Sequence, residues 1–405
     1  MKRFIAVLLL MAIFLTACGV DPEATNPSTP ETSSTDPIQQ PTNPTDPKPT
    51  DPEPTDPEPT DPEPTDPEPT DPEPTDPEPT DPVPPPEPVI TQITMTFTGD
   101  CTFGRNQIAA YNNSFDQYAD EKGLDYFLSD VKHIFENDDI TIVNLEGSLT
   151  TSTDIQPKNW NHKGDPRYVQ ILTDNSVEVA GMGNNHRVDY GISGCEETVQ
   201  VLTNAGVGWC YDDNYLIHEV KGVKVGFVSV NEVYDGTTVE TWLTEGYEYL
   251  RQSGCTIVIA LVHWGEAHTT VPEDYQVELG HKLIDMGYDL VVGNHAHVLQ
   301  AMELYKGRMI CYSLGNFCYG GSKNPTDKDC GIFQQTFTLV DGELMLDTDI
   351  QFTPCSISSV SNKNDYHPVV LEGAERDRVI EKMNGYSQQF GFALTEDGKC
   401  PEETE

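Results

Sequence analysis

The chain has 405 residues and a formal net charge of −44, from 67 acidic and 23 basic side chains. This acidity excludes nucleic acid as a partner, because a polyanion would be repelled from most of the surface. Residues 89–405 alone contain 48 acidic and 20 basic residues, so a metal ion or a local basic pocket would be needed to hold an anionic substrate.

Residues 1–18 have the pattern of a bacterial secretory signal, in which two basic residues precede an apolar stretch. That stretch, residues 4–15, is too short to span a bilayer comfortably. The tetrapeptide L-T-A-C that follows resembles a lipobox, which implies cleavage before Cys18 and a lipid on its sulfur atom. Ordinary cleavage after Ala17 and an uncleaved anchor are the alternatives. We therefore expect a lipid-anchored protein on the extracellular face of a bacterial cell membrane.

Residues 19–88 differ in composition from the rest of the chain, being rich in Pro, Thr, Asp and Glu with almost no apolar side chains. Six copies of T-D-P-E-P occupy residues 50–79. A segment of this composition cannot bury a core, and its prolines favour an extended polyproline II conformation of ~3.1 Å per residue. We predict a disordered stalk that lifts the following domain on the order of 150 Å from the membrane, with a passive spacer as the simplest role.

From residue 89 onward, strand and helix patterns alternate along the chain. In its first half they predict a strand at 90–98, a helix at 124–137, a strand at 140–145, a helix at 166–172, a strand at 176–180 and a helix at 193–205. In the second half they predict two strands within 215–230, a helix at 239–252, a strand at 256–262, a helix at 272–286, a strand at 290–292, two strands within 302–314, a hairpin within 333–352 and a helix at 375–389. This order predicts a mixed α/β sandwich domain at 89–360, followed by a C-terminal helix and tail at 361–405.

Several apolar runs end in polar side chains that are suited to a functional site. The run at 179–191, V-A-G-M-G-N-N-H-R-V-D-Y-G, delivers Asn184, Asn185, His186 and Asp189 in quick succession. Other runs end at Asp100, Glu146, His263, His295 and His297. Because site residues in α/β sheets lie at the carboxyl ends of strands, we expect these side chains to converge.

The chemistry of this set indicates a divalent metal site. Carboxylates, an amide oxygen and imidazoles suit one or two ions of Mn, Fe or Zn, so the predicted ligands are Asp100, Glu146, Asn185, His263, His295 and His297. Such ions polarise a phosphoryl or carbonyl oxygen and activate water. His186 would act as an acid or an electrostatic stabiliser, and Asp189 or Glu266 would orient imidazoles. Each histidine taken alone is equally consistent with a structural role.

Six short motifs follow one another at consistent spacing. They are G-D-C-T-F-G-R at 99–105, N-L-E-G at 144–147, N-N-H-R-V-D-Y-G at 184–191, H-W-G-E at 263–266, G-N-H-A-H at 293–297 and S-L-G-N-F at 313–317. Together they resemble the CapA family, whose members are associated with poly-γ-glutamate capsule synthesis and have a domain similar to calcineurin-like metallophosphoesterases. The resemblance implies a four-layer sandwich and a metal-binding site.

By position, the resemblance assigns metal-site roles to the residues already singled out. Asp100 matches the first-strand aspartate, Glu146 the bridging carboxylate, Asn185 and His186 the asparagine-histidine pair, and His263, His295 and His297 the later histidines. Two positions depart from the metallophosphoesterase pattern: Thr102 stands where a histidine is usual, and Glu146 stands where an aspartate is usual. The first of two metal positions therefore lacks a ligand.

The substrate side is less specific in the sequence. Residues predicted to contact a carboxylate or phosphate are Arg105, Arg167, Asn184, Glu266 and Asn316. A surface role is the commoner explanation for either arginine, and packing is the commoner one for Asn316.

Three functions are consistent with these patterns. The first is a membrane-tethered protein that handles poly-γ-glutamate or a similar anionic envelope polymer, as a metal-dependent hydrolase or transferase. The second is an extracellular metal-dependent phosphodiesterase, and the third is a non-catalytic polymer-binding scaffold. The chain has no G-x-x-x-x-G-K-[ST] motif for ATP and could not drive peptide ligation alone, so membrane ligase subunits are expected as partners.

Overall fold

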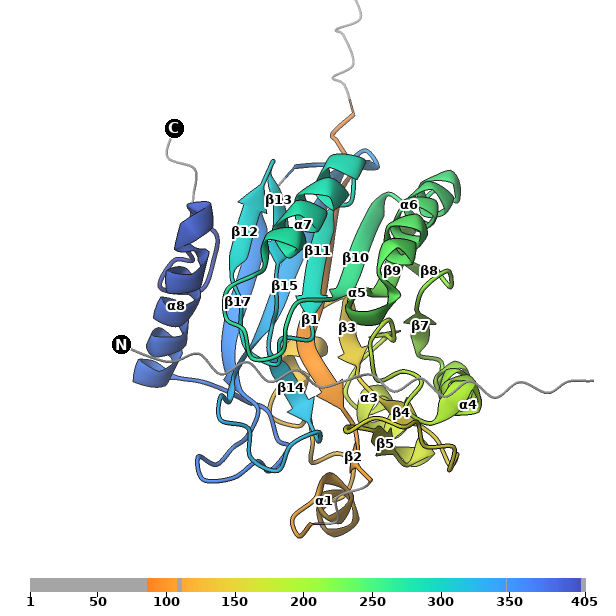
Figure 1. Ribbon diagram of the computed structural model, residues 1–405. Helices are drawn as coiled ribbons and strands as arrows, with labels where there is room; N and C mark the ends of the chain where they lie inside the picture. The colour runs from red at the N-terminus through yellow and green to blue at the C-terminus, as the bar shows by residue number, and fades with distance from the viewer. Residues whose placement is uncertain (1–85, 108–110, 347, 402–405) are drawn as a thin grey trace, which may run out of the picture. The chain divides into compact units, whose positions relative to one another are not determined.

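The computed structural model describes residues 86–107, 111–346 and 348–401. The predicted signal, its Cys18 and nearly all of the predicted stalk lie outside the described residues. Within the described part, no helix is both long and apolar enough to cross a membrane. The folded unit consists of two β-sheets packed face to face, with helices on the outer face of each (Figure 1). This arrangement confirms the predicted α/β four-layer sandwich.

The first sheet has the amino-terminal strand near its centre. Its main path runs β18 (Val369–Val370), β17 (Asp349–Ser356), β15 (Asp329–Val340), β1 (Ile90–Thr102), β3 (Ile140–Leu145), β6 (Val179–Gly181) and β7 (Gly208–Cys210). Strands β1, β3, β6 and β7 are parallel, whereas β15 and β17 are antiparallel to their neighbours. Two short strands extend this sheet, because β14 (Asn316–Tyr319) pairs with the end of β1 and β16 (Glu343–Leu344) pairs with β15.

The second sheet is mainly parallel. Its order is β12 (Met302–Tyr305), β13 (Arg308–Cys311), β11 (Leu290–Asn294), β10 (Ile257–His263), β9 (Val223–Asn231) and β8 (Leu216–Val220), and the two edge strands are antiparallel. Every residue of β10 is buried, as its apolar run predicted for a strand covered on both faces. A small third sheet joins β2 (Arg105–Asn106), β5 (His162–Gly164) and β4 (Ser148–Leu149).

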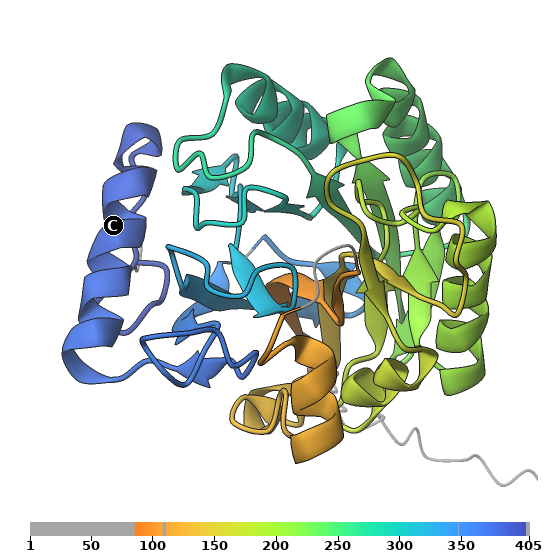
Figure 2. The same ribbon diagram turned by 60° about the horizontal axis from the view of Figure 1, so that its bottom comes forward.

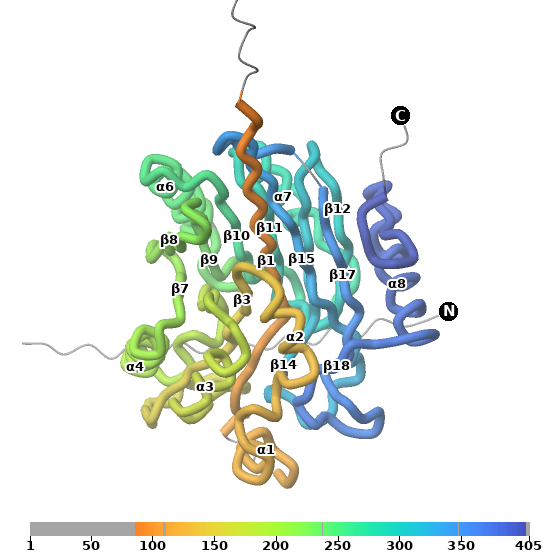
Figure 3. Tube along the Cα trace, turned by 180° about the vertical axis from the view of Figure 1, so that it is seen from behind, coloured from red at the N-terminus to blue at the C-terminus, as the bar shows by residue number. Residues whose placement is uncertain are grey.

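Helices complete the outer layers. Those packed on the first sheet are α1 (Phe115–Lys122), α2 (Lys132–Phe135), α3 (Val169–Thr173), which continues the 3-10 turn η1 (Pro166–Tyr168), and α4 (Gly191–Ala205). Figure 3 shows α2 and α3 lying over this sheet from behind. The second sheet is covered by α6 (Thr237–Gln252), which follows the short α5 (Glu232–Asp235), and by α7 (Asp274–Met286). The last helix, α8 (Gly373–Ser387), ends in the turn η2 (Gln388–Phe390) and lies beside β12 and β17 (Figure 1).

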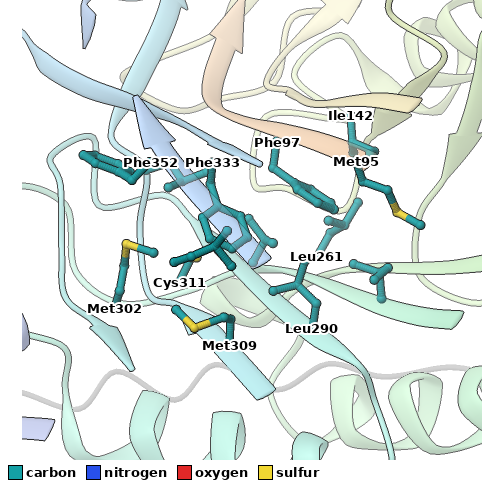
Figure 4. Close-up of a cluster of buried hydrophobic side chains, with 14 of the residues drawn as sticks. Met95, Phe97, Ile142, Leu261, Leu290, Met302, Met309, Cys311, Phe333 and Phe352 are labelled. Carbon is teal, nitrogen blue, oxygen red and sulfur yellow. The ribbon is translucent and has the colours of Figure 1, made fainter. Parts of the chain in front are cut away.

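Large apolar side chains fill the space between the two sheets. Phe97 and Phe333 from the first sheet meet Leu261 and Leu290 from the second, and all four are almost fully buried (Figure 4). Burial of each such side chain stabilises the fold by about 1.5–3 kcal/mol. This shared core fixes one sheet against the other, so residues at the ends of both sheets keep a set separation.

The structure differs locally from the sequence prediction around residues 115–137. Only Lys132–Phe135 of the helix predicted at 124–137 is helical, and the preceding residues form turns. The apolar side chains that suggested the helix are still buried, Phe127 and Leu128 among them, so tertiary packing holds them without regular helix. Helix α1 was not predicted, because its sequence is mostly polar; Ser114 caps it by accepting a hydrogen bond from the main-chain N of Gln117.

The strand register gathers polar residues at one end of the unit. Asp100 of β1 lies opposite Asn144 of β3, and His263 of β10 lies opposite Asn294 of β11. Figure 2 brings forward this end, where the loops after the parallel strands meet. The two sheets therefore deliver their strand ends to a common place, as expected for α/β sheets.

The contact between β1 and β14 leaves no room for a side chain at Gly99, since an added Cβ atom would lie 2.0 Å from the carbonyl oxygen of Gly315. We expect Gly99→Ala to separate these strands and to lower the free energy of unfolding by about 1–3 kcal/mol. Gly385→Ala is the matched control, because an added Cβ in the exposed face of α8 meets nothing within 4 Å and the helix should gain up to about 1 kcal/mol. Urea unfolding measures both changes. Equal stability of the two variants would contradict the close packing of β1 on β14.

Candidate metal centre

The predicted ligands lie together at the ends of both sheets. Asp100 belongs to β1, Glu146 directly follows β3, and His263 is the last residue of β10. Asn185 lies after β6, and His295 and His297 lie after β11. Asp100 and Glu146 are fully buried, His263 is 1% exposed and His295 is 8% exposed. Segments far apart in the sequence therefore form one enclosed cluster.

The two histidines after β11, His295 and His297, lie in a strained stretch of backbone. His295 and His297 have φ angles of +93° and +56°, a region that residues other than glycine seldom adopt. Such a conformation costs about 1–3 kcal/mol per residue and persists only where the surrounding structure imposes it. The sharp turn after β11 allows two imidazoles separated by one residue to face the same cluster.

Glu146 occupies the middle of the cluster. Its Oε1 atom lies 3.7 Å from Nε2 of His263 and 3.7 Å from Nε2 of His297. Thr102 donates a hydrogen bond of 3.2 Å to the other oxygen, Oε2. Oε1 is buried without a hydrogen-bond partner among the residues that the structure describes. A buried carboxylate oxygen in this state is costly unless the carboxyl is protonated or a cation lies beside it.

A second set of ligand atoms surrounds His263. Its Nε2 atom lies 3.0 Å from Oδ1 of Asn185 and 3.0 Å from Nδ1 of His295. One proton on Nε2 satisfies only one of these two acceptors, whereas a metal ion is bound by all three atoms. Ligand atoms of Glu146, His295 and His297 also lie within 4.8 Å of one another.

Asp100 and Asn144 connect the two halves of the cluster. The Nδ2 atom of Asn144 donates to Oδ1 of Asp100 at 2.7 Å and lies 3.3 Å from Nδ1 of His263. Oδ2 of Asp100 lies 3.0 Å from Nδ1 of His297. The motif N-L-E-G contains Asn144, but an amide inside an apolar strand carried no signal that it would orient two ligands. Sequence reasoning therefore missed this residue.

The electrostatics of the cluster also favour a bound cation. Burial raises the pKa of the Glu146 carboxyl to about 8, against the opposing effect of the His297 imidazole. Burial lowers the pKa of His263 well below its ordinary value, and the neighbouring imidazoles of His295 and His297 lower it further. A divalent cation would stabilise both the ionised carboxylate and the neutral imidazole. On these observations the residues fit a divalent metal ion.

His186 lies against the cluster without sharing its hydrogen bonds. Its Nδ1 atom is 2.6 Å from Oδ2 of the fully buried Asp189, and its Nε2 atom is 3.9 Å from Oε1 of Glu146. Lys158 forms an ion pair with the other oxygen of Asp189 and donates to the carbonyl of Asn185 at 2.7 Å. Burial lowers the pKa of His186 well below its ordinary value, and the charge of Lys158 adds to this effect. The pair thus holds a neutral imidazole in one orientation beside the ligands.

A pocket of about 520 Å³ opens from the cluster to the surface. Its inner wall contains Asn185, His186, His295 and His297, and its outer wall contains Tyr111, Trp160 and Lys323. His162 also lines the pocket, although nothing in the surrounding sequence W-N-H-K-G marked it as a site residue. A ligand in this pocket would reach the candidate metal ligands directly.

The residues predicted to bind substrate are distributed differently. Asn316 lines the pocket. Its Oδ1 atom lies 3.0 Å from Nδ1 of His297, and its Nδ2 atom donates to the main-chain carbonyl of His297. Asn184 is buried. Its Nδ2 atom donates to Oδ1 of Asn144 and to the carbonyl of Leu145, so it positions Asn144 and does not face the pocket. The other three residues, Arg105, Arg167 and Glu266, are not among those lining the pocket. Arg105 is paired with Asp116, Arg167 with Asp120, and Glu266 is exposed.

Comparison with known proteins identifies relatives of the chain. Residues 94–320 match the family model described as "Bacterial capsule synthesis protein PGA_cap". The chain is 27% identical over 324 residues to the capsule biosynthesis protein CapA of Bacillus anthracis. This match covers 72% of this chain and 76% of that protein. It is 27% identical over 248 residues to the PGA biosynthesis protein CapA of Bacillus subtilis (strain 168), covering 56% of this chain and 63% of that protein.

Among solved structures, a 5'-nucleotidase from Candida albicans SC5314 aligns with a TM-score of 0.38 and 11% sequence identity, covering 75% of this chain and 59% of that one. The family model spans more than half of the chain and contains every predicted metal ligand. The chain therefore belongs to the family of bacterial capsule synthesis proteins described as PGA_cap, and the resemblance to CapA is confirmed.

Proposed function

We propose that this protein processes an anionic envelope polymer of the poly-γ-glutamate type during capsule synthesis, as a metal-dependent hydrolase or transferase. The observation that carries the proposal is the convergence of six candidate ligands from both sheets at the inner end of one pocket. Family membership and the names of the Bacillus relatives, a capsule biosynthesis protein and a PGA biosynthesis protein, support the polymer class.

The cluster would hold a divalent ion of Mn, Fe or Zn. The residues in contact with it would be Asp100, Glu146, Asn185, His263, His295 and His297. When bound, such an ion would supply Lewis acidity at the carbonyl oxygen beside the bond to be broken. It also neutralises a polymer carboxylate that this acidic protein would otherwise repel.

His186 would transfer the proton in this reaction. Asp189 fixes its Nδ1 atom at 2.6 Å, so Nε2 faces the cluster. In hydrolysis of a γ-glutamyl amide, water adds to the carbonyl carbon and the carbon–nitrogen bond breaks. His186 takes the proton from the water and passes it to the leaving amine. In transfer, an amine replaces the water and the same proton balance holds.

Membrane attachment belongs to the same proposal. A lipid on Cys18 would place the folded unit outside the cell, and residues 19–88 would separate it from the membrane. Because polymer synthesis needs an energy source and the sequence contains no G-x-x-x-x-G-K-[ST] motif for ATP, membrane ligase subunits would act beside it. The pocket would then work on chains already made.

Loss of the central carboxylate should weaken metal binding strongly. We expect Glu146→Gln to reduce Mn affinity by more than the roughly 10–100-fold that loss of an outer partner causes, because Oε1 lies within 4 Å of three imidazoles. Titration calorimetry and elemental analysis measure the change. Glu303→Gln is the matched control, since Glu303 is also buried and bonded to a histidine, His281, at 2.8 Å. Equal loss of metal in both variants would contradict a site centred on Glu146.

Loss of the proton-transfer group should affect turnover and spare the metal. We expect His186→Asn to lower hydrolysis of a γ-glutamyl chain by about 10²–10⁴-fold while Mn content stays at the wild-type level. Chain length is followed by gel electrophoresis, with an aryl phosphodiester as a second substrate. Turnover of the phosphodiester alone would favour the extracellular phosphodiesterase, and bound metal without turnover of either would favour the non-catalytic scaffold.

Loss of the lipid-bearing sulfur should release the protein. We expect Cys18→Ser to move it from the membrane fraction to the soluble fraction and to abolish palmitate labelling, because the acyl chains provide the membrane affinity. Cys400→Ser, at a half-buried thiol near the other end of the chain, is the control and should stay with the membrane. Retention of the Cys18→Ser protein at the membrane would contradict lipid anchoring.

A further inference from the structure

One buried histidine in the pocket wall has no role in the function proposed above. His162 opens β5 (His162–Gly164) and is 3% exposed. It lines the pocket, and its Nδ1 atom has no hydrogen-bond partner in the described part of the chain. Leaving a buried polar atom unpaired costs about 1–3 kcal/mol. An apolar side chain at this position would avoid that cost.

The main chain around His162 fixes the imidazole in place. Its main-chain N donates to Oδ2 of Asp189 at 2.5 Å, the same oxygen that holds His186. On its other side the backbone passes over Gly147, where an added Cβ atom would lie 3.2 Å from Cβ of His162. Gly147 has a φ of +135°, a conformation that favours glycine. The ring position is therefore set by the residue that follows Glu146 and by the partner of His186.

The ring of His162 faces other polar rings of the site. Its centroid lies 4.2 Å from that of His186, with an angle of 43° between the planes. The Tyr319 ring packs edge-on against it at 6.4 Å. Lys158 neutralises Asp189 behind this pair. A group entering the pocket next to both imidazoles would thus meet the ring of His162 and the proton-accepting Nε2 of His186, while Asp189 behind them is already paired.

We propose that His162 is a substrate-binding residue that donates a hydrogen bond to an oxyanion of the substrate, beside His186. The shared chemistry is that of a carboxylate or a phosphoryl oxygen. The inference rests on the proposed function, because it places the reacting end of the substrate in the same pocket. It adds an imidazole that acts on the substrate from the wall next to the proton-transfer group.

The test compares His162→Phe with wild type, using the full chain in detergent after loading with Mn. Phenylalanine keeps a planar aromatic ring, slightly larger than imidazole, and the main-chain bond to Asp189, and it removes the ring nitrogens. Calorimetry with inorganic phosphate, and separately with a short γ-glutamyl peptide, measures oxyanion binding. We expect binding of at least one probe to weaken by about 10- to 100-fold, as for a lost hydrogen bond to a charged group. Mn content should not change.

Two further variants separate a specific role from a general one. His268→Phe makes the same substitution at an exposed histidine of the same pocket, whose ring lies 6.0 Å from that of His297, and should bind the probes as wild type does. His162→Gln restores an N–H donor and should recover part of the affinity. A weakened response to phosphate alone identifies a phosphoryl group, and a weakened response to the peptide alone identifies a carboxylate.

Several results would overturn the inference. If His162→Phe binds both probes with unchanged affinity, the proposed hydrogen bond does not exist. If the variant loses Mn together with the probe, His162 belongs to the metal cluster instead. An equal loss in His268→Phe makes the effect unspecific, and a Mn-loaded wild type that binds neither probe also refutes the inference. Failure of the wild type to bind Mn at all is a different outcome, because it refutes the proposed function as well.

Discussion

The site depends on one buried carboxylate, Glu146, whose nearest compensating group is the imidazole of His297, 3.7 Å away. Glu146 is fully enclosed, yet its Oε1 atom has no hydrogen-bond partner within the described ranges. Isolated buried charge is costly, so the surrounding structure must force this arrangement, and a positive group beside the carboxylate or protonation of the carboxyl must relieve it. The apolar core between the sheets holds Glu146 and His263 close together. Glu146 follows a strand of the first sheet, and His263 ends a strand of the second. Their separation is therefore a property of the whole sandwich.

Polar residues behind the ligands make this arrangement precise. Asn144 holds Asp100 and contacts His263, and Asn184 in turn donates to Asn144. The segment before β5 does the same for the other wall, where Lys158 pairs with Asp189 and bonds the carbonyl of Asn185. Buried networks of this kind hold ligands only when each member is satisfied. The strained backbone at His295 fits the same picture, since strain concentrates where a site is held against local preference.

The sequence predicted the parts of the molecule that follow from local pattern. Strands such as β10 were predictable because a continuous apolar run has one stable environment. The convergence of the candidate ligands was predictable because polar groups at the carboxyl ends of parallel strands lie at one edge of a sheet. Asn144 was not predictable, since its neighbours read as an ordinary buried strand. Arg105 and Arg167 suggested anion binding, but the structure pairs them with Asp116 and Asp120, which lie near them only in the fold. A hydrogen bond from the main-chain N of His162 to Asp189 holds His162 at the pocket. The spacing of residues in the sequence does not reveal a main-chain hydrogen bond of this kind.

Thr102 shows how the cluster tolerates a missing ligand. Its hydroxyl donates to Oε2 of Glu146, so one oxygen of the central carboxylate is already satisfied and only Oε1 needs a cation. At the end of the cluster near Thr102, Asp100 and His297 lie 3.0 Å apart and compensate each other. At the other end, Asn185, His263 and His295 offer donor atoms with no carboxylate of their own. The demand for positive charge is thus greatest between Glu146 and these three residues. The threonine hydroxyl at position 102 therefore acts on the central carboxylate itself, at the oxygen that faces away from these three residues.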